Sequence, residues 1–291
     1  MIIELFNIVA PVLVCAAIGF TWARLGLPFE TPFVTSLVTN IAAPCLILAT
    51  LTKLNVSAEA FGQMAGAGAL ALLIFMVVAA AVLKAAKLSL HSFLPAMMFG
   101  NTGNMGLPLA LFAFGETGLA LGIAFFAVNA VAQFTLGALI SSGSMSLGRL
   151  VRTPVLWAVS VALVSMFSGV KPPTFIASTL TLLGNIAIGL MLLALGVSLA
   201  RLKVRSLGRT FGLAVFRLAM GFGVGLGLTY VLGLEGAQRG VVILACSMPV
   251  AVFNYLFAQR YGREAEEVAS VIVTSTLISF ATLPLLLLVV L

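Results

Sequence analysis

Long apolar runs alternate with short polar stretches along the whole chain. Each run is about 20 residues long, which matches the ~30 Å hydrocarbon core of a lipid bilayer. The first run follows the acidic Glu4 and meets no basic residue before Arg24, so we expect a spanning helix there and not a cleaved signal peptide. The pattern predicts an all-α integral membrane protein with ten transmembrane helices, over residues 5–23, 32–52, 62–83, 93–114, 117–140, 154–170, 174–199, 208–232, 238–258 and 267–290.

The composition agrees with this pattern. Of the 291 residues, 62% are hydrophobic and only 8% are charged, so no soluble domain of useful size is expected. The net charge of +7 fits contact with anionic lipid headgroups, and we expect the lipid bilayer and no nucleic acid as a partner. The protein is therefore predicted to reside in the cell inner (plasma) membrane.

The basic residues predict an orientation in that membrane. The connections after the odd-numbered helices carry eleven of the fifteen Lys and Arg residues. The opposite face carries only Lys53, Lys171 and Arg239, and Arg217 falls inside the eighth helix. By the positive-inside rule the first set of connections is cytoplasmic, which leaves both termini outside the cytoplasm.

An internal repeat relates the two halves of the chain. The segment LVTNIAAPCLIL (37–48) aligns with LLGNIAIGLMLL (182–193), and MGLPLALF (105–112) aligns with CSMPVAVF (246–253). The second helix thus matches the seventh and the fourth matches the ninth. A repeat of five helices enters the membrane from opposite sides in its two copies, as in many secondary transporters. The predicted organisation is a first repeat over 1–142, a cytoplasmic linker over 143–152 and a second repeat over 153–291.

The stretch FGNTGNMGLPLALF (99–112) interrupts the fourth helix. Gly100, Gly103 and Gly106 each weaken a helix by about 1 kcal/mol relative to alanine, and Pro108 removes a backbone donor. Unpaired backbone groups cost several kcal/mol each in hydrocarbon, so such a break is tolerated only beside protein or a water-filled cavity. We therefore predict broken, crossing fourth and ninth helices with a cavity near the membrane centre.

The residues at these breaks favour an anionic ligand. Proline suits the first position of a helix, so new half-helices are predicted to begin near Pro108 and Pro249. Their N-termini would both point toward the membrane centre and attract negative charge. Asn101, Asn104 and Asn254 are candidate substrate-binding residues, because neutral amides can hold a carboxylate. The alternative is structural, since Pro, Gly and Asn also occur in membrane helices as packing elements.

Three further polar residues keep two interpretations each. Asn40 and Asn185 occupy equivalent repeat positions, and they either line the cavity or tie their helices to the broken ones. Arg217 either snorkels or pairs structurally, or else attracts substrate anions.

Enzymatic chemistry lacks its usual residues in this sequence. The chain contains no aspartate and one histidine, His91, and the eight glutamates fall at or near helix ends. Cys15, Cys45 and Cys246 lie inside apolar runs and have no metal-ligand spacing. We expect no enzyme, no catalytic residue, no metal and no cofactor, and the identity of any coupling ion stays open.

The paired proline motifs are similar to those of a known family. The segments GNTGNMGLPL (100–109), SMPVAVFNYLFAQRYG (247–262) and STLISFATLPLLLL (275–288) resemble the auxin efflux carrier family, which includes plant PIN-FORMED auxin exporters and bacterial malate or malonate permeases. The resemblance implies two inverted five-helix repeats, a scaffold and a transport domain, elevator-type movement of an organic anion, and a homodimer. It places the family's crossover prolines at Pro108 and Pro249 and its motif asparagine at Asn101.

The expected function is secondary transport of a small organic anion, such as malate, malonate or an auxin-like acid. Asn104 and Asn254 depart from the plant exporters, which favours a smaller substrate than auxin. The rivals are a sodium-coupled carrier of the bile acid or arsenite type, a receptor that binds without transport, and a channel. Neither the direction of transport nor its coupling can be predicted from these residues.

Overall fold

The computed structural model describes residues 2–53, 57–143, 154–202 and 207–291. Within these ranges the chain is helical, with one isolated β-bridge and no strand. Most of the predicted linker over 143–152 lies outside the described residues. The elements are α1 (Ile2–Arg24), α2 (Thr31–Leu37), η1 (Val38–Ala42), α3 (Ala43–Lys53), α4 (Ala58–Ala85), α5 (Leu90–Met98), η2 (Thr102–Gly106), α6 (Leu107–Ala132), η3 (Gln133–Gly137), α7 (Ala138–Ser142), α9 (Pro154–Ser168), α10 (Thr174–Arg201), α11 (Leu207–Val231), α12 (Gly236–Cys246), α13 (Phe253–Arg260) and α14 (Ala265–Val290), where η marks a π-helix.

Seven helices of the described ranges are long and apolar enough to cross a membrane, compared with the ten that the sequence predicts. One of them is a continuous run of 41 residues, Thr102–Ser142, but Gly115 inside it is non-helical, with φ 65° and ψ −160°. Two more predicted helices are not counted among the seven. The one over 154–170 corresponds to α9, which is short, and the one over 238–258 is interrupted between α12 and α13. The all-helical membrane fold is confirmed, whereas the count of ten spans stays a prediction.

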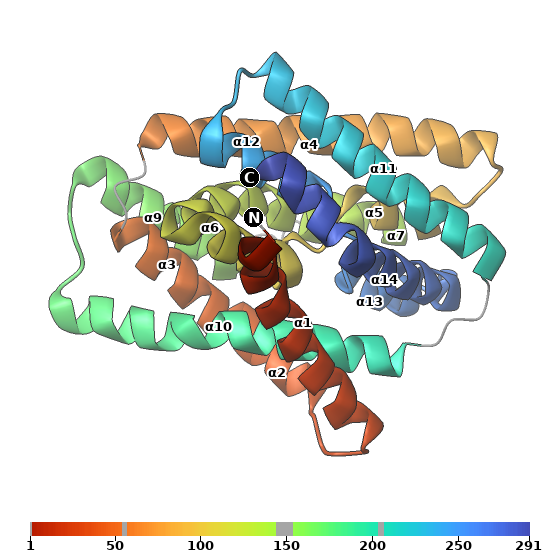
Figure 1. Ribbon diagram of the computed structural model, residues 1–291, viewed down its shortest axis with the longest axis horizontal. Coiled ribbons are helices and arrows are strands. Elements are labelled where there is room, and N and C mark those ends of the chain that lie inside the picture. The colour runs from red at the N-terminus through yellow and green to blue at the C-terminus, as the bar shows by residue number, and fades with distance from the viewer. Residues whose placement is uncertain (1, 54–56, 144–153, 203–206) are drawn as a thin grey trace.

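The helices pack in two groups. In the framework group, α1 packs mainly against α10, and α3 packs against α9 and α10. In the crossing group, α4 packs against α5 and α6, α12 packs against α6 and α11, and α11 packs against α14. Figure 1 shows α4 and α10 running along opposite sides of the molecule, with α5, α6 and α7 between them.

Glycines allow the closest contacts within the framework group. A Cβ atom placed on Gly196 of α10 would collide with the backbone of Ala16 in α1, and one on Gly19 would collide with the backbone of Leu193. Gly184 of α10 also lies close to a neighbouring backbone, that of Leu46 in α3, although less closely than the other two glycines. Small residues at such crossings let apolar helices approach within van der Waals contact, which is a main source of stability in a bilayer.

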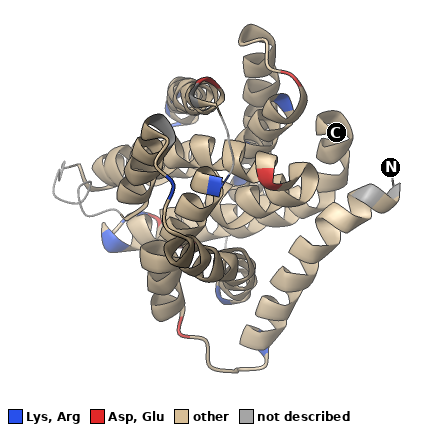
Figure 2. Cartoon of the chain, turned by 90° about the vertical axis from the view of Figure 1, so that its left-hand side faces the viewer, with Lys and Arg blue, Asp and Glu red and all other residues tan. Residues whose placement is uncertain are grey.

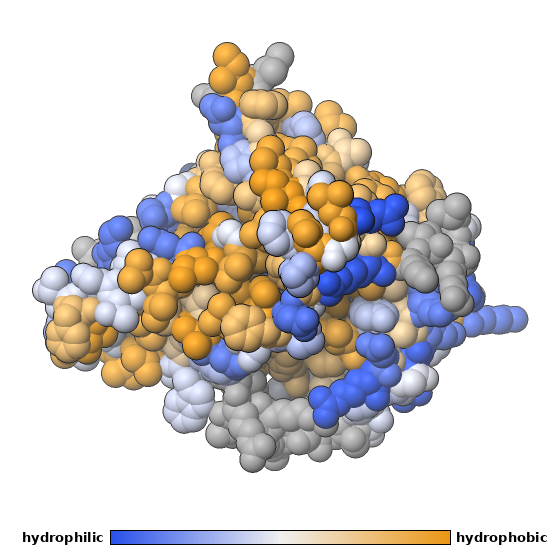
Figure 3. All heavy atoms as spheres, turned by 90° about the horizontal axis from the view of Figure 1, so that it is seen from below, coloured by the Kyte–Doolittle hydropathy of each residue, from blue (hydrophilic) through white to orange (hydrophobic). Residues whose placement is uncertain are grey.

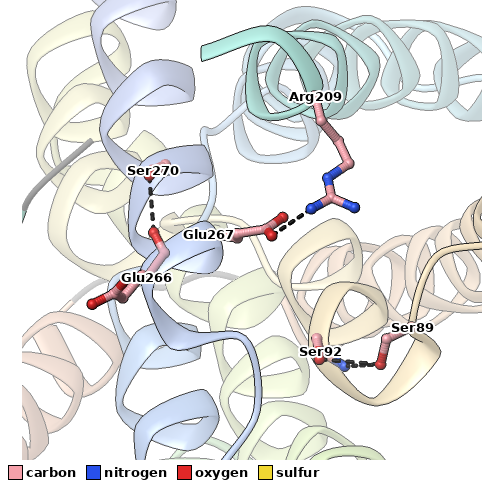
Figure 4. A network of polar contacts seen from close by, with 6 residues as sticks. All are labelled: Ser89, Ser92, Arg209, Glu266, Glu267 and Ser270. Atoms are coloured by element: carbon pink, nitrogen blue, oxygen red, sulfur yellow. Dashed lines mark hydrogen bonds and ion pairs between the residues drawn. The ribbon is translucent and has the colours of Figure 1, made fainter. Parts of the chain in front are cut away.

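The outer surface fits a lipid environment. Large apolar side chains such as Val77, Tyr230 and Leu285 are more than half exposed, and apolar residues cover much of the face in Figure 3. Charged residues lie mainly at helix ends and connections in Figure 2. At one such end, Arg209 of α11 forms an ion pair with Glu267 of α14, as Figure 4 shows, which joins the starts of these two helices.

Candidate functional site

Two interrupted segments cross at the centre of the crossing group. Helix α5 ends at Met98 and α12 ends at Cys246, and the chain then runs without regular helix until Thr102 and Phe253. Gly100 and Val250 form an antiparallel bridge between the two segments. The N–H of Asn101 donates to the carbonyl of Pro249 at 2.7 Å, and the N–H of Ala251 donates to that of Phe99 at 3.1 Å. Each segment thereby satisfies backbone groups that the other leaves open.

The α-helix α6 begins next to Pro108, near the predicted position, whereas no helix begins at Pro249. Pro108 lies in the first turn of α6, but helical structure has already resumed at Thr102. Pro249 lies in the non-helical segment, and α13 begins only at Phe253. Gly100 lets the crossing pack closely, because a Cβ atom there would displace the guanidinium of Arg217 and press against the carbonyl of Met248. Gly103 and Gly106 instead face the side chains of Phe126 and Met248.

A small cavity, the central pocket, lies beside this crossing and between the two helix groups. Its volume is about 60 Å³, which is room for about two water molecules or one carboxylate group. The three π-helices all contribute to its wall, through Thr39 of η1, Asn104 of η2 and Gln133 of η3. π-Helical turns are rare and occur frequently at functional sites, so their meeting at one cavity singles it out.

Two amide groups line the central pocket with unused hydrogen-bond donors. Asn101 is 4% exposed and Gln133 is 9% exposed. Neither Asn101 Nδ2 nor Gln133 Nε2 has a hydrogen-bond partner in the described part of the chain. An unpaired buried amide costs about 1–3 kcal/mol, so two at one cavity are the arrangement expected for an acceptor ligand such as a carboxylate.

The sequence does not predict a binding role for Gln133, because a glutamine inside an apolar helix commonly forms a hydrogen bond to a neighbouring helix. Its position relative to the break at residues 99–101 depends on tertiary packing, which the sequence pattern does not report. The only available signal was that a polar residue interrupts the apolar run of the fifth predicted helix.

Asn104 and Asn254 differ in what they can offer a ligand. Asn104 is partly buried and lines both the central pocket and a larger cavity next to it. Asn254 is 3% exposed, and its Nδ2 donates to the carbonyls of Phe99 at 3.1 Å and Ala251 at 3.0 Å. Both amide hydrogens of Asn254 are therefore engaged by the crossing itself.

The larger cavity, which we call the vestibule, continues from the central pocket. It has a volume of about 300 Å³ and shares Thr39, Asn104 and Phe253 with the central pocket. Arg201, at the end of α10, lies in its wall, and its guanidinium donates to Thr31 Oγ1 at 2.6 Å and to the carbonyl of Phe29 at 2.9 Å. An anion would meet this arginine on its way to the central pocket.

The repeat-related asparagines do not reach the central pocket. Asn40 is exposed and donates to Ser36 Oγ at 2.9 Å, while its neighbour Thr39 lines the cavity instead. Asn185 is also exposed and lines a separate cavity, together with Lys53. Neither asparagine touches the crossing of Asn101 with Pro249.

Arg217 lies buried behind the crossing. It is 1% exposed, and its Nη1 donates to the carbonyl of Cys246, the last residue of α12, at 3.0 Å. Its guanidinium carbon stands 4.9 Å from the centre of the Phe75 ring. These contacts agree with the structural interpretation of Arg217, in which its positive charge stabilises the carbonyl end of a helix, and Arg217 lines neither the central pocket nor the larger cavity beside it.

The fold and these cavities define a multi-pass membrane protein with a mainly apolar cavity, carrying a few amide groups, between two helix groups, which is an arrangement found in transporters. The sequence matches the family of membrane transport proteins over residues 5–145 and 138–287. The chain belongs to this family, the auxin efflux carrier family.

Individual relatives are distant from this chain. An uncharacterized transporter of Methanocaldococcus jannaschii is 26% identical over 96% of both chains. A protein of Rhizobium meliloti whose name assigns it to malonate transport is 26% identical over 63% of this chain and 62% of its own. Auxin efflux carrier component 1 of Arabidopsis thaliana is 27% identical over 45% of this chain and 22% of its own.

Proposed function

We propose that the protein is a secondary transporter of a small carboxylate, which binds in the central pocket. The observation that carries this proposal is the pair of unused amide donors, Asn101 Nδ2 and Gln133 Nε2, on one cavity of about 60 Å³. Asn104 is proposed to shape the junction between the central pocket and the vestibule. Asn254, whose donors are engaged, is proposed to hold the crossing together. Pro249 is proposed to keep its segment free of regular helix, and Pro108 removes a backbone donor from the first turn of α6.

The chain is proposed to cross the membrane ten times as two inverted repeats, 1–142 and 153–291. Each of the two repeats contains one such interruption, after Met98 in the first and after Cys246 in the second, which supports the proposal. The N-terminal end of α1 and the C-terminal end of α14 lie close together in Figures 1 and 2, which fits an even number of crossings because both ends must then lie on the same side of the membrane. In the proposed orientation both ends lie outside the cytoplasm and Arg201 lies at the cytoplasmic side.

The mechanism is proposed to be of the elevator type. The framework group would stay fixed, and the crossing group would carry the bound anion across the membrane. This assignment is supported by the position of the central pocket and the vestibule, both of which are walled by residues from the two groups. The proposed assembly is a homodimer in the plasma membrane, as the family resemblance implies.

The substrate class is proposed from the donor set. Neutral amides without a permanent charge in the pocket suit a small carboxylate that must also be released. The names of the relatives, which refer to malonate and to auxin, agree with an organic acid. Substrates of the size of malate or malonate fit a central pocket that holds one carboxylate and a vestibule that receives the rest of the molecule.

A thermal-shift screen of the purified protein tests this proposal. Small mono- and dicarboxylates are compared with their uncharged amides, for example malonate with malonamide, at equal concentration and ionic strength. A ligand that binds only the folded state raises the melting temperature, so at least one carboxylate should do so and its amide should not. Equal shifts from acid and amide, or no shift from any acid, would contradict the proposed pocket.

A further inference from the structure

Another cavity lies between the same two helix groups, beyond the central pocket. This outer pocket has a volume of about 280 Å³, and its wall includes Thr50 and Lys53 of α3 and Asn185 of α10. On α3 the wall of the central pocket ends at Ala43, and that of the outer pocket begins one helical turn later, at Leu46. The central pocket shares lining residues with the vestibule but, among the described residues, none with the outer pocket.

The outer pocket and the vestibule are lined by equivalent positions of the two repeats. When the alignment of residues 37–48 with 182–193 is continued along the same helices, several residues that line the outer pocket are aligned with residues that line the vestibule. The alignment of 105–112 with 246–253 adds one more pair. The matched pairs are Leu46 with Met191, Ala49 with Ala194, Lys53 with Ser198, Gly184 with Thr39, and Leu111 with Val252.

This correspondence has a geometric meaning. Two inverted repeats place equivalent residues on opposite faces of the membrane. The vestibule adjoins the central pocket and shares lining residues with it, whereas its repeat-related counterpart shares none among the described residues. The two cavities are therefore the expected openings of one pathway toward the two faces of the membrane.

The outer pocket also has the chemistry to receive an anion. Lys53, at the end of α3, is exposed and supplies a positive charge, as Arg201 does at the end of α10 in the vestibule. Thr50 and Asn185 add neutral hydrogen-bonding groups. Glu116, which follows the non-helical Gly115, brings one negative charge from the crossing group. Its repulsion would keep binding weak enough for release, which suits a transit site.

We propose that the outer pocket is a second anion-binding site, where Lys53, Thr50 and Asn185 hold the carboxylate substrate on the membrane face opposite to the vestibule. The proposal rests on the proposed transport function for the identity of its ligand. Its location and its preference for anions can nevertheless be measured without any transport.

Cysteine labelling tests the location. Single cysteines are introduced as Asn185→Cys in the outer pocket and Ser198→Cys in the vestibule, in a parent chain with Cys15→Ala and Cys45→Ala. The full-length protein is treated with membrane-impermeant thiol reagents in intact cells and in inverted vesicles. Asn185→Cys should react from the extracytoplasmic face only and Ser198→Cys from the cytoplasmic face only. Reaction of both from the same face would overturn the proposal, and the parent chain is the control for background labelling.

The charge of the reagent tests the preference for anions. The reaction rates of Asn185→Cys with sulfonatoethyl and with trimethylammonium-ethyl methanethiosulfonate give a ratio that reports the local potential. Lys53→Gln should lower the ratio of anionic to cationic rate by about threefold or more, and Glu116→Gln should raise it. Lys53→Arg should preserve it, and Lys171→Gln, which removes a charge from a connection outside the pocket, should leave it unchanged.

The outcomes separate this site from the transport function. An unchanged ratio in Lys53→Gln overturns the outer anion site, even if the protein transports a carboxylate. Labelling that behaves as expected, together with no carboxylate binding in the thermal-shift screen, supports an anion site on the outer face and contradicts the proposed substrate.

Discussion

The side-chain amide of Asn254 donates a 3.1 Å hydrogen bond to the main-chain carbonyl of Phe99, a residue 155 positions earlier in the chain. A second bond, of 3.0 Å, goes to the carbonyl of Ala251. Asn254 therefore fastens the start of α13 to the segment that follows α5. Asn101, on the other side of the same crossing, lines the central pocket, and its own amide nitrogen has no hydrogen-bond partner among the described residues. The two asparagines have different roles, and variants of each should fail in different ways.

Asn254→Ala is expected to destabilise the protein. It removes two side-chain hydrogen bonds, each worth about 1 kcal/mol, while the carbonyls of Phe99 and Ala251 keep their backbone donors. The melting temperature of the purified protein should fall by several degrees, which scanning fluorimetry can measure. An unchanged melting temperature would show that the bonds to Phe99 and Ala251 do not hold the crossing.

Asn101→Leu is expected to leave stability unchanged or to increase it slightly. The variant removes an unpaired buried donor, whose presence costs free energy in the absence of a ligand. Carboxylate binding should weaken at least tenfold, a loss of about 1.4 kcal/mol, in the ligand-induced thermal shift. Clear destabilisation without ligand would contradict the assignment of Asn101 to the ligand.

Gln133→Ala should weaken carboxylate binding in the same way, because Gln133 Nε2 is the second unused donor of the pocket. Gln259→Ala is the matched control, since Gln259 is an exposed glutamine of α13 that lines neither the pocket nor the vestibule. Isothermal titration of both variants with the same carboxylate makes the comparison. If the two variants bind equally well, Gln133 is not a ligand.

Arg217→Ala is expected to lower the free energy of unfolding by about 2–4 kcal/mol. The variant opens a cavity beside Phe75 and leaves the carbonyl of Cys246 without its donor. Arg217→Lys keeps the charge near the end of α12 and should recover part of this loss. The measurement is the melting temperature of both variants, and equal values for Arg217→Ala and the wild type would contradict the structural role.

The sequence predicts the parts of this structure that depend on local chemistry. Gly100 stands in the interruption that the structure has at residues 99–101, whereas Gly103 and Gly106 lie in the π-helix η2 and Pro108 lies in the first turn of α6. The apolar runs likewise mark the membrane helices, since each must cover the same thickness of hydrocarbon. The family resemblance at Asn101 and Pro249 leads to the two segments that cross.

Other features depend on contacts between distant segments. The π-helices that meet at the central pocket, the unused amide of Gln133 and the engaged amide of Asn254 all follow from how helices pack. A pattern of polar and apolar residues cannot distinguish Asn101 from Asn254, because both are asparagines beside a helix break. Their roles differ because their surroundings differ: Asn101 lines the central pocket, whereas Asn254 donates to the carbonyl of Phe99.

Uptake of radiolabelled malonate into proteoliposomes that contain the purified protein tests the central claim most directly, with Asn101→Leu and Gln259→Ala measured beside the wild type. We predict saturable uptake by the wild type and by Gln259→Ala, competition by other small carboxylates, and loss of uptake in Asn101→Leu with its melting temperature retained. Equal uptake by the wild type and Asn101→Leu, or no flux of any carboxylate that binds, would contradict transport through the central pocket.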